Sequence, residues 1–190
     1  MFNDVLHPPF TLRAVIREDL PIFARWFSDV EVLQYLSRVW PHSVEDEEEW
    51  FQKVRQRPIW ERPFAIDVRE GKGWKLIGNM GLNRIDWINR SAILGIAIGE
   101  KDYWDRGYGT EAVQAMLASA FDILNLNRVE LEVFDFNIRA RKSYEKAGFR
   151  LEGRRRQARY LSGRYHDVLV MGILRHEWEP PEWWKPFPLH

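Results

Sequence analysis

The segment 64–98 constrains the fold most, because it contains three strand-like stretches joined by short turns. In the first stretch Phe64, Ile66 and Val68 alternate with more polar neighbours, which is the period of a half-buried strand. Strands joined by turns this short pair with their neighbours, so the segment predicts an antiparallel meander. Its strands are expected at 64–69, 74–86 and 90–98.

Helical periodicity is clearest in residues 110–124, where apolar residues recur along one stripe. Two amphipathic helices are expected earlier, near Asp19 and from Ser43 to Arg55, and a short one runs from an Asn137 cap to Gly148. Further strands are expected at 10–16, 129–133, 149–160 and 164–174. The predicted order β-α-α-β-β-β-α-β-α-β-β indicates an α/β fold whose mixed, mostly antiparallel sheet of about seven strands carries helices on both faces.

The composition fits one domain of 190 residues, with 45% apolar residues to form a core. No stretch has the roughly 20 apolar residues of a membrane-spanning helix, and no secretory signal is evident, so we expect a cytoplasmic protein. The 28 basic residues balance the 28 acidic ones, which makes nucleic acid an unexpected partner. The absence of cysteine excludes disulfides and a mechanism through an enzyme thiol.

The C-terminal segment differs in composition from the rest. We expect the domain to occupy residues 1–176 and a tryptophan- and proline-rich tail to occupy 177–190. Trp178, Trp183 and Trp184 together would form an unusually large apolar patch if exposed. The tail is therefore expected either to cover the domain or to contribute to a homodimer.

The segment 104–110 is the best candidate for chemistry, since it joins a strand to the helix at 110–124. Gly107 and Gly109 allow a tight turn that brings backbone N–H groups close to a ligand. Those groups lie at a helix N-terminus, which favours an anion such as a pyrophosphate. A glycine turn that only starts a helix is the alternative. The spacing matches neither a Walker loop nor a dinucleotide-binding fingerprint.

Three stretches of the chain resemble the GNAT superfamily of N-acetyltransferases, in the branch that includes ribosomal-protein-alanine and spermidine acetyltransferases. The stretches cover 105–112, 124–129 and 136–149, and the similarity extends over nearly the whole chain. The resemblance implies a sheet that splays apart to hold acetyl-CoA. The five histidines lack metal-ligand spacing, so no metal is expected. It implies cofactor contacts from Gly95, Ile96, Ala97, Ile98, Asp105, Arg106, Gly107, Tyr108, Gly109, Thr110, Asn137 and Lys142.

Tyr144 is the implied catalytic residue, near the thioester sulfur. Asn137 and Tyr144 are seven residues apart, which places them on one helical face. A phenol there can give the departing CoA thiolate a proton or a hydrogen bond. An alternative is that Tyr144 is simply an aromatic residue of the core.

Two positions depart from the family pattern. Trp104 stands where glutamine or arginine is frequent, and Ile93 stands where a glutamate often takes the proton of the amine. The general base is therefore unassigned, and Asp135, Asp86 and Asp67 are weak substitutes.

We therefore expect an acetyl-CoA-dependent N-acetyltransferase in which an amine attacks directly within a ternary complex. The acceptor is left open between a protein N-terminus, a polyamine and an aminoglycoside-like amine, and the acidic run at 45–49 slightly favours a cationic small molecule. The alternative is a non-catalytic acyl-CoA sensor or an RNA-associated module that uses the arginines between Arg150 and Arg159.

Overall fold

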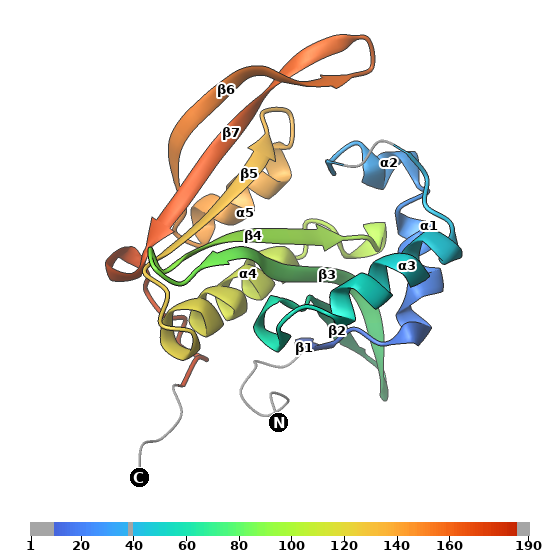
Figure 1. The fold of residues 1–190 in the computed structure, drawn as a ribbon, viewed down its shortest axis with the longest axis horizontal. Coiled ribbons are helices and arrows are strands. Elements are labelled where there is room, and N and C mark those ends of the chain that lie inside the picture. The colour runs from blue at the N-terminus through green and yellow to red at the C-terminus, as the bar shows by residue number, and fades with distance from the viewer. Residues whose placement is uncertain (1–9, 38–39, 186–190) are drawn as a thin grey trace.

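The computed structural model describes residues 10–37 and 40–185, which form a seven-stranded mixed sheet with helices on both faces (Figure 1). The strand order is β1-β2-β3-β4-β5-β7-β6. The strands are β1 (Phe10–Ala14), β2 (Phe64–Glu70), β3 (Gly73–Asp86), β4 (Ser91–Ile98), β5 (Arg128–Phe134), β6 (Arg150–Leu161) and β7 (Arg164–Leu174). The predicted fold class is confirmed.

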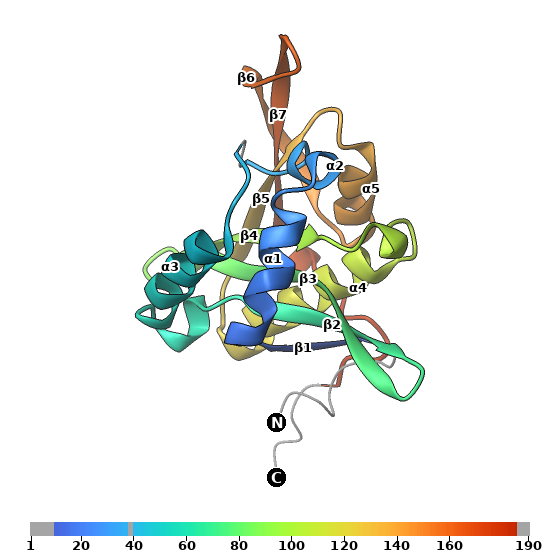
Figure 2. The same ribbon diagram turned by 90° about the vertical axis from the view of Figure 1, so that its right-hand side faces the viewer.

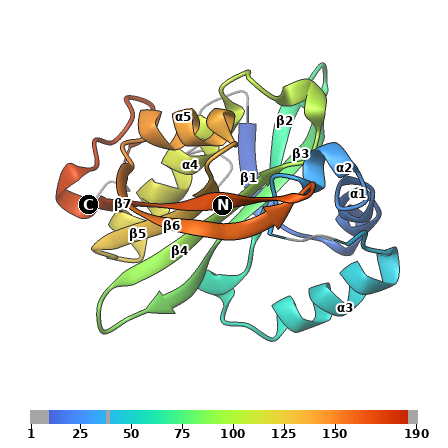
Figure 3. The same ribbon diagram turned by 90° about the horizontal axis from the view of Figure 1, so that it is seen from above.

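Two groups of helices cover the two faces of the sheet (Figure 3). One group packs against Ala65 and Leu76 in a small core, and the other packs on the main core of the molecule. The first group is α1 (Leu20–Trp26), α2 (Val30–Leu33) and α3 (Val44–Arg55); the second is α4 (Tyr108–Ala118) and α5 (Ile138–Lys146). Among the described residues no helix has the length and apolar character to cross a bilayer.

The local signals in the sequence explain most of the element boundaries. The Ser43 side chain accepts from the amide of Asp46, and the Asp46 carboxylate accepts in return from the amide of Ser43, so α3 starts as its capping box predicts. Two details differ from expectation. The four-residue α2 was not anticipated, and the helix expected to run to residue 124 becomes a π-helical segment over Ser119–Ile123.

The pairing of β4 with β5 decides where the sheet opens. The two strands are parallel and pair only from Ser91 to Ile93 on β4. Beyond Ile93, β4 stays paired with β3, whereas β5 pairs with β7 over its whole length. The two strands therefore separate, and in Figure 1 β5 leans away from β4 toward the projecting β6–β7 hairpin.

The tail up to residue 185 lies against the body of the same chain. The ring of Trp178 packs 5.5 Å from that of Phe121, and the ring of Trp183 lies 6.3 Å from that of Phe10. Trp184 is only 7% exposed, and its Nε1 donates a 2.8 Å hydrogen bond to Asp122. The described part of the tail therefore covers an edge of the main core, and in Figure 2 its red ribbon lies below β1.

We predict that Trp184→Ala lowers the free energy of unfolding by about 3 kcal/mol, the usual cost of truncating a buried tryptophan. The change removes both ring burial and the hydrogen bond to Asp122. Urea denaturation measures it. Trp40→Ala is the control, because Trp40 is 77% exposed and its removal should change stability by less than about 0.5 kcal/mol. Equal effects of the two changes would contradict the structural role of the tail.

Candidate functional site

A cleft of about 810 Å³ opens where β4 and β5 separate. Its walls come from the divergent halves of the two strands, from the turn before α4, from α5 and from the segment around α2. The charged side chains among its lining residues are Arg84, Asp105, Glu132, Arg139, Lys142 and Lys146.

The turn before α4 forms one end of the cleft. Asp105 and Gly107 adopt positive φ angles of 59° and 90°. A Cβ added at Gly107 would meet no atom within 4 Å, so the space over this residue is open. In the part of the chain that the structure describes, the amides of Gly107, Tyr108 and Gly109 have no protein acceptor. This arrangement suits the oxygens of a phosphate group.

Thr110 closes this turn instead of adding a free donor. Its amide donates to the carbonyl of Gly107 at 2.9 Å, and its hydroxyl lies 2.8 Å from that of Ser143. The second contact joins α4 to α5. The amide of Thr110 is thus engaged within the turn, and its side chain holds the two helices together.

The separated half of β4 forms the floor of the cleft. Gly95, Ile96, Ala97 and Ile98 line it, and their edge toward β5 has no strand partner. Trp104 Nε1 donates to the carbonyl of Ile98 at 2.8 Å. The tryptophan that departs from the family pattern thus fixes the end of the strand. The other backbone groups along this edge can pair with an extended ligand, as a missing strand would.

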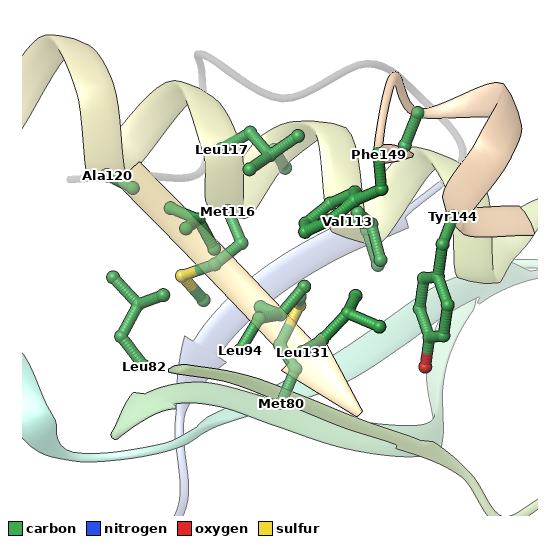
Figure 4. Close-up of a cluster of buried hydrophobic side chains, with 14 of the residues drawn as sticks. Met80, Leu82, Leu94, Val113, Met116, Leu117, Ala120, Leu131, Tyr144 and Phe149 are labelled. Carbon is green, nitrogen blue, oxygen red and sulfur yellow. The ribbon is translucent and has the colours of Figure 1, made fainter. Parts of the chain in front are cut away.

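Asn137 and Tyr144 both face the cleft from α5, as their spacing predicts. The Asn137 side chain accepts from the amide of Ala140 at 3.2 Å, so its oxygen caps the helix. Tyr144 is only 8% exposed, and its ring packs against Phe149 in the main core. Its hydroxyl has no hydrogen-bond partner among the described residues, and Figure 4 shows it directed away from the labelled cluster.

Burial controls the acidity of this phenol. Desolvation raises the pKa of Tyr144 to about 12, because the phenolate would lose most of its hydration. The hydroxyl is therefore protonated at neutral pH and available as a hydrogen-bond donor.

Arg139 bridges the cleft near its mouth. Its guanidinium carbon lies 3.7 Å from the centre of the Trp104 ring and 5.1 Å from that of Tyr35. The cation is thus held between an aromatic residue that follows β4 and one that follows α2. These contacts connect α5 to both neighbouring segments across the cleft.

The face of the sheet opposite α4 supplies a second set of polar groups. Register places Asn83 opposite Ile93 and Asn79 opposite Ala97, so these side chains leave on the same face as Ile93. On β5 the alternation puts Glu132 on this face as well, whereas Leu131 and Val133 enter the main core. Glu132 forms an ion pair with Arg155.

Most of the predicted site residues are brought together. Arg106 and Tyr108 are the exceptions, since their side chains do not line the cleft and Arg106 lies 5.3 Å over the ring of Tyr103. Those that line it are Gly95, Ile96, Ala97, Ile98, Asp105, Gly107, Gly109, Thr110, Asn137, Lys142 and Tyr144.

The three substitute bases named from sequence lie elsewhere. Asp67 is buried in an ion pair with Arg13, and Asp86 accepts from the amides of Ile88 and Asn89, which lowers its pKa. Asp135 lies 3.6 Å from His166 and does not line the cleft. The carboxylate that does line it beside β4 is Glu132, which sequence reasoning missed. The alternation along β5 predicts which face of the sheet carries Glu132, but it does not predict that this face opens onto the cleft.

The acidic run at 45–49 also lies away from the cleft. It belongs to α3, none of whose residues is in the lining. Glu47 pairs with His42, Glu48 with Arg17 and Glu49 with Lys53. Its position therefore gives no support to a cationic acceptor.

Most arginines of the basic stretch between 150 and 159 form ion pairs or hydrogen bonds within the chain. Arg150 pairs with Glu177, Arg154 with Asp167 and Arg155 with Glu132. Arg159 donates to the carbonyls of Leu36 and Ser37 and lies over the ring of Phe134. Arg155 and Arg159 thus join the hairpin to the lining of the cleft, whereas Arg150 and Arg154 pair with acidic residues outside it.

The comparisons with known proteins agree with this geometry. The model of an acetyltransferase (GNAT) domain matches residues 10–150. An uncharacterized N-acetyltransferase p20 from Bacillus licheniformis is 31% identical over 170 residues, or 88% of this chain and 94% of the relative. Spermidine N(1)-acetyltransferase from Vibrio cholerae is 30% identical over 173 residues, or 91% of this chain and 97% of the relative.

A solved structure shares the fold as well. The crystal structure of spermidine N-acetyltransferase from Vibrio cholerae in complex with CoA and spermine superposes with a TM-score of 0.81 at 30% identity, covering 90% of this chain and 98% of that one. A cleft between two diverging strands, a glycine turn at a helix N-terminus and a matching domain model over most of the chain lead to one conclusion: this chain belongs to the GNAT acetyltransferase family.

Proposed function

We propose that the protein transfers the acetyl group of acetyl-CoA to a primary amine by direct attack of the amine within a ternary complex. The observation that carries this proposal is the placement of Tyr144 and Glu132 on opposite faces of the open sheet, both lining one cleft. One face can then receive the departing thiolate while the other delivers the amine. No cysteine is present to carry an acetyl group, which favours one direct step.

The residues of the cleft fit the CoA part of the donor. The open space at Gly107 and the unengaged amides of the turn suit a pyrophosphate, and the unpaired edge of β4 suits the amide-bearing arm. Lys142 and Lys146 add positive charge along α5. The crystal structure of the Vibrio cholerae relative contains CoA, which supports the same assignment here. When bound, acetyl-CoA supplies a thioester whose carbonyl carbon accepts the amine.

Glu132 is assigned to the amine. A primary amine arrives mostly as an ammonium ion at neutral pH, and a carboxylate in the cleft attracts it. The amine must lose a proton before its lone pair forms the C–N bond. Glu132 holds the ammonium ion and passes that proton on through water, because a carboxylate is too weak a base to retain it.

Tyr144 is assigned to the sulfur. As the C–S bond breaks, negative charge develops on a thiol whose ordinary pKa is about 8.5. Full proton transfer from a phenol of pKa about 12 would be uphill by roughly 3 to 4 units, or about 5 kcal/mol. Tyr144 therefore stabilises the thiolate by donating a hydrogen bond, and solvent supplies the final proton.

We predict that Gly107→Val abolishes the stabilisation of the fold by acetyl-CoA. At a concentration 100 times its Kd, acetyl-CoA should raise the free energy of unfolding of the unmodified protein by about 2.7 kcal/mol. The valine side chain would occupy the space left for the phosphates. Thermal melting with and without acetyl-CoA measures the change.

Gly71→Val is the matched control for this experiment. Gly71 also has a positive φ and no atom within 4 Å of an added Cβ, but it lies in the β2–β3 turn. Both variants should lose similar stability from backbone strain, and only Gly107→Val should lose the response to acetyl-CoA. A full response in Gly107→Val would refute the phosphate assignment.

We predict that Tyr144→Phe lowers kcat about 100-fold, the scale of losing one donor to a developing charge. The ring remains in the core, so acetyl-CoA binding and the melting temperature should stay nearly unchanged. Because Tyr144 is protonated well beyond pH 9, it should contribute no fall in the rate of the unmodified enzyme between pH 7 and 9. Steady-state thiol release tests both points, and full kcat in the variant would assign Tyr144 to packing alone.

We predict that Glu132→Gln lowers kcat/KM for the amine at least about 10-fold while acetyl-CoA binding is retained. Glu130→Gln is the control. Glu130 lies two residues earlier on the same face of β5 and pairs with Arg128, but it does not line the cleft. An equal loss in the two variants would show that Glu132 acts only through the fold.

A further inference from the structure

The acceptor half of the cleft is poor in acidic groups. Its wall beside α2 is apolar and is formed by Phe27, Val32, Leu36 and, from β5, Phe134. In the lining that the structure describes, the carboxylates are Asp105, in the turn before α4, and Glu132. A polyamine carries several cationic amines, and this surface offers them a single carboxylate.

Arg84 adds an unpaired positive charge to the lining of the cleft, near the ends of β4 and β5 that are paired. It adopts a positive φ of 51° at an irregularity of β3, where the register with β4 shifts between Asn83 and Asp86. Its side chain makes no hydrogen bond or ion pair with the described residues, although it lines the cleft. The side chain of the adjacent Asn83, and that of Asn79 farther along β3, are likewise without a hydrogen bond among the described residues.

The two charges stand on opposite sides of β4. β3 and β5 are the two neighbours of β4, and Glu132 lies just beyond Glu130, the last residue of β5 that pairs with β4. The side chains of Glu132 and Arg84 both line the cleft, so one molecule bound there can meet both. Glu132 suits an ammonium ion, and an arginine binds a carboxylate through two parallel hydrogen bonds.

We infer that the acceptor is a zwitterion with an apolar body, carrying one primary amine for Glu132 and one carboxylate for Arg84. This inference rests on the proposed acetyl transfer and specifies its substrate. An apolar amino acid has this chemistry, and so does a short peptide with a free C-terminus. The side-chain amide of Asn83, next to Arg84, can accept or donate hydrogen bonds beside the carboxylate. The spermine in the related crystal structure has no carboxylate and would leave Arg84 unpaired.

The test compares amines that differ in one group. Thiol release from acetyl-CoA is measured with leucine, leucinamide, isoamylamine, the dipeptide Leu-Leu and spermidine. Leucine and isoamylamine differ by the carboxylate alone, and leucinamide keeps the shape without the charge. The dipeptide moves the carboxylate away from the amine, so its rate relative to leucine shows which spacing the cleft takes. We expect kcat/KM for leucine or the dipeptide to exceed that for isoamylamine and for spermidine at least about 10-fold.

The variant Arg84→Gln tests whether Arg84 binds the carboxylate of the acceptor. It should lower kcat/KM for leucine or the dipeptide about 10- to 100-fold and leave the value for isoamylamine unchanged, so the ratio of the two collapses. The ratio of kcat/KM between the two amines is compared in the variant and in the unmodified protein, so the difference in basicity between the amines cancels. Arg90→Gln is the control, because Arg90 is an exposed arginine of nearly the same positive φ outside the cleft, and it should leave the ratio unchanged.

The outcomes separate the inference from the proposed function. If spermidine or isoamylamine is the better acceptor, or if Arg84→Gln affects all amines equally, the protein is an acetyltransferase and the zwitterion assignment is wrong. If acetyl-CoA stabilises the protein but no amine releases thiol, the proposed function fails and the inference falls with it.

Discussion

The limited pairing of β4 with β5 is the constraint on which the rest of the structure depends. Three residue pairs hold the two strands together at one end, and the rest of β5 follows β7. The separation leaves a strand edge without a partner in the middle of the sheet. Unpaired strand edges normally occur only at the outer strands of a sheet. A ligand with amide groups can satisfy that edge. The cleft is thus made by the topology, and side chains then determine what it accepts.

The sheet also keeps the two chemical tasks apart. Alternation along β5 sends Leu131 into the core beneath Tyr144, while Glu132 emerges on the other face. The phenol lies in an apolar environment that raises its pKa to about 12 and keeps it protonated, whereas the carboxylate lies among polar groups and pairs with Arg155. The two environments differ because successive residues of a strand point to opposite faces of the sheet.

Sequence reasoning captured the features that local interactions determine. The N-cap at Ser43, the cap at Asn137 and the apolar stripe of α4 each fix an element without reference to the rest of the chain. Sequence reasoning failed for features that depend on where an element lies in the folded chain. The acidic run was placed near the acceptor although α3 packs on α1, and Glu132 and Arg84 were missed because a strand pattern does not show where a sheet opens. The short α2 has too few residues to produce a helical period.

The order of the strands has a consequence for synthesis of the chain on a ribosome. β5 leaves the ribosome before β7, yet β7 is the partner that draws it away from β4 and lies between β5 and β6 in the sheet. Until residue 174 has emerged, β5 is an open edge that a second nascent chain could pair with. The rings of Trp183 and Trp184 reach Phe10 and Asp122 only later still. The cleft is therefore among the last features to form, and a chain that stops short of the tail has most of its secondary structure but not its closed core.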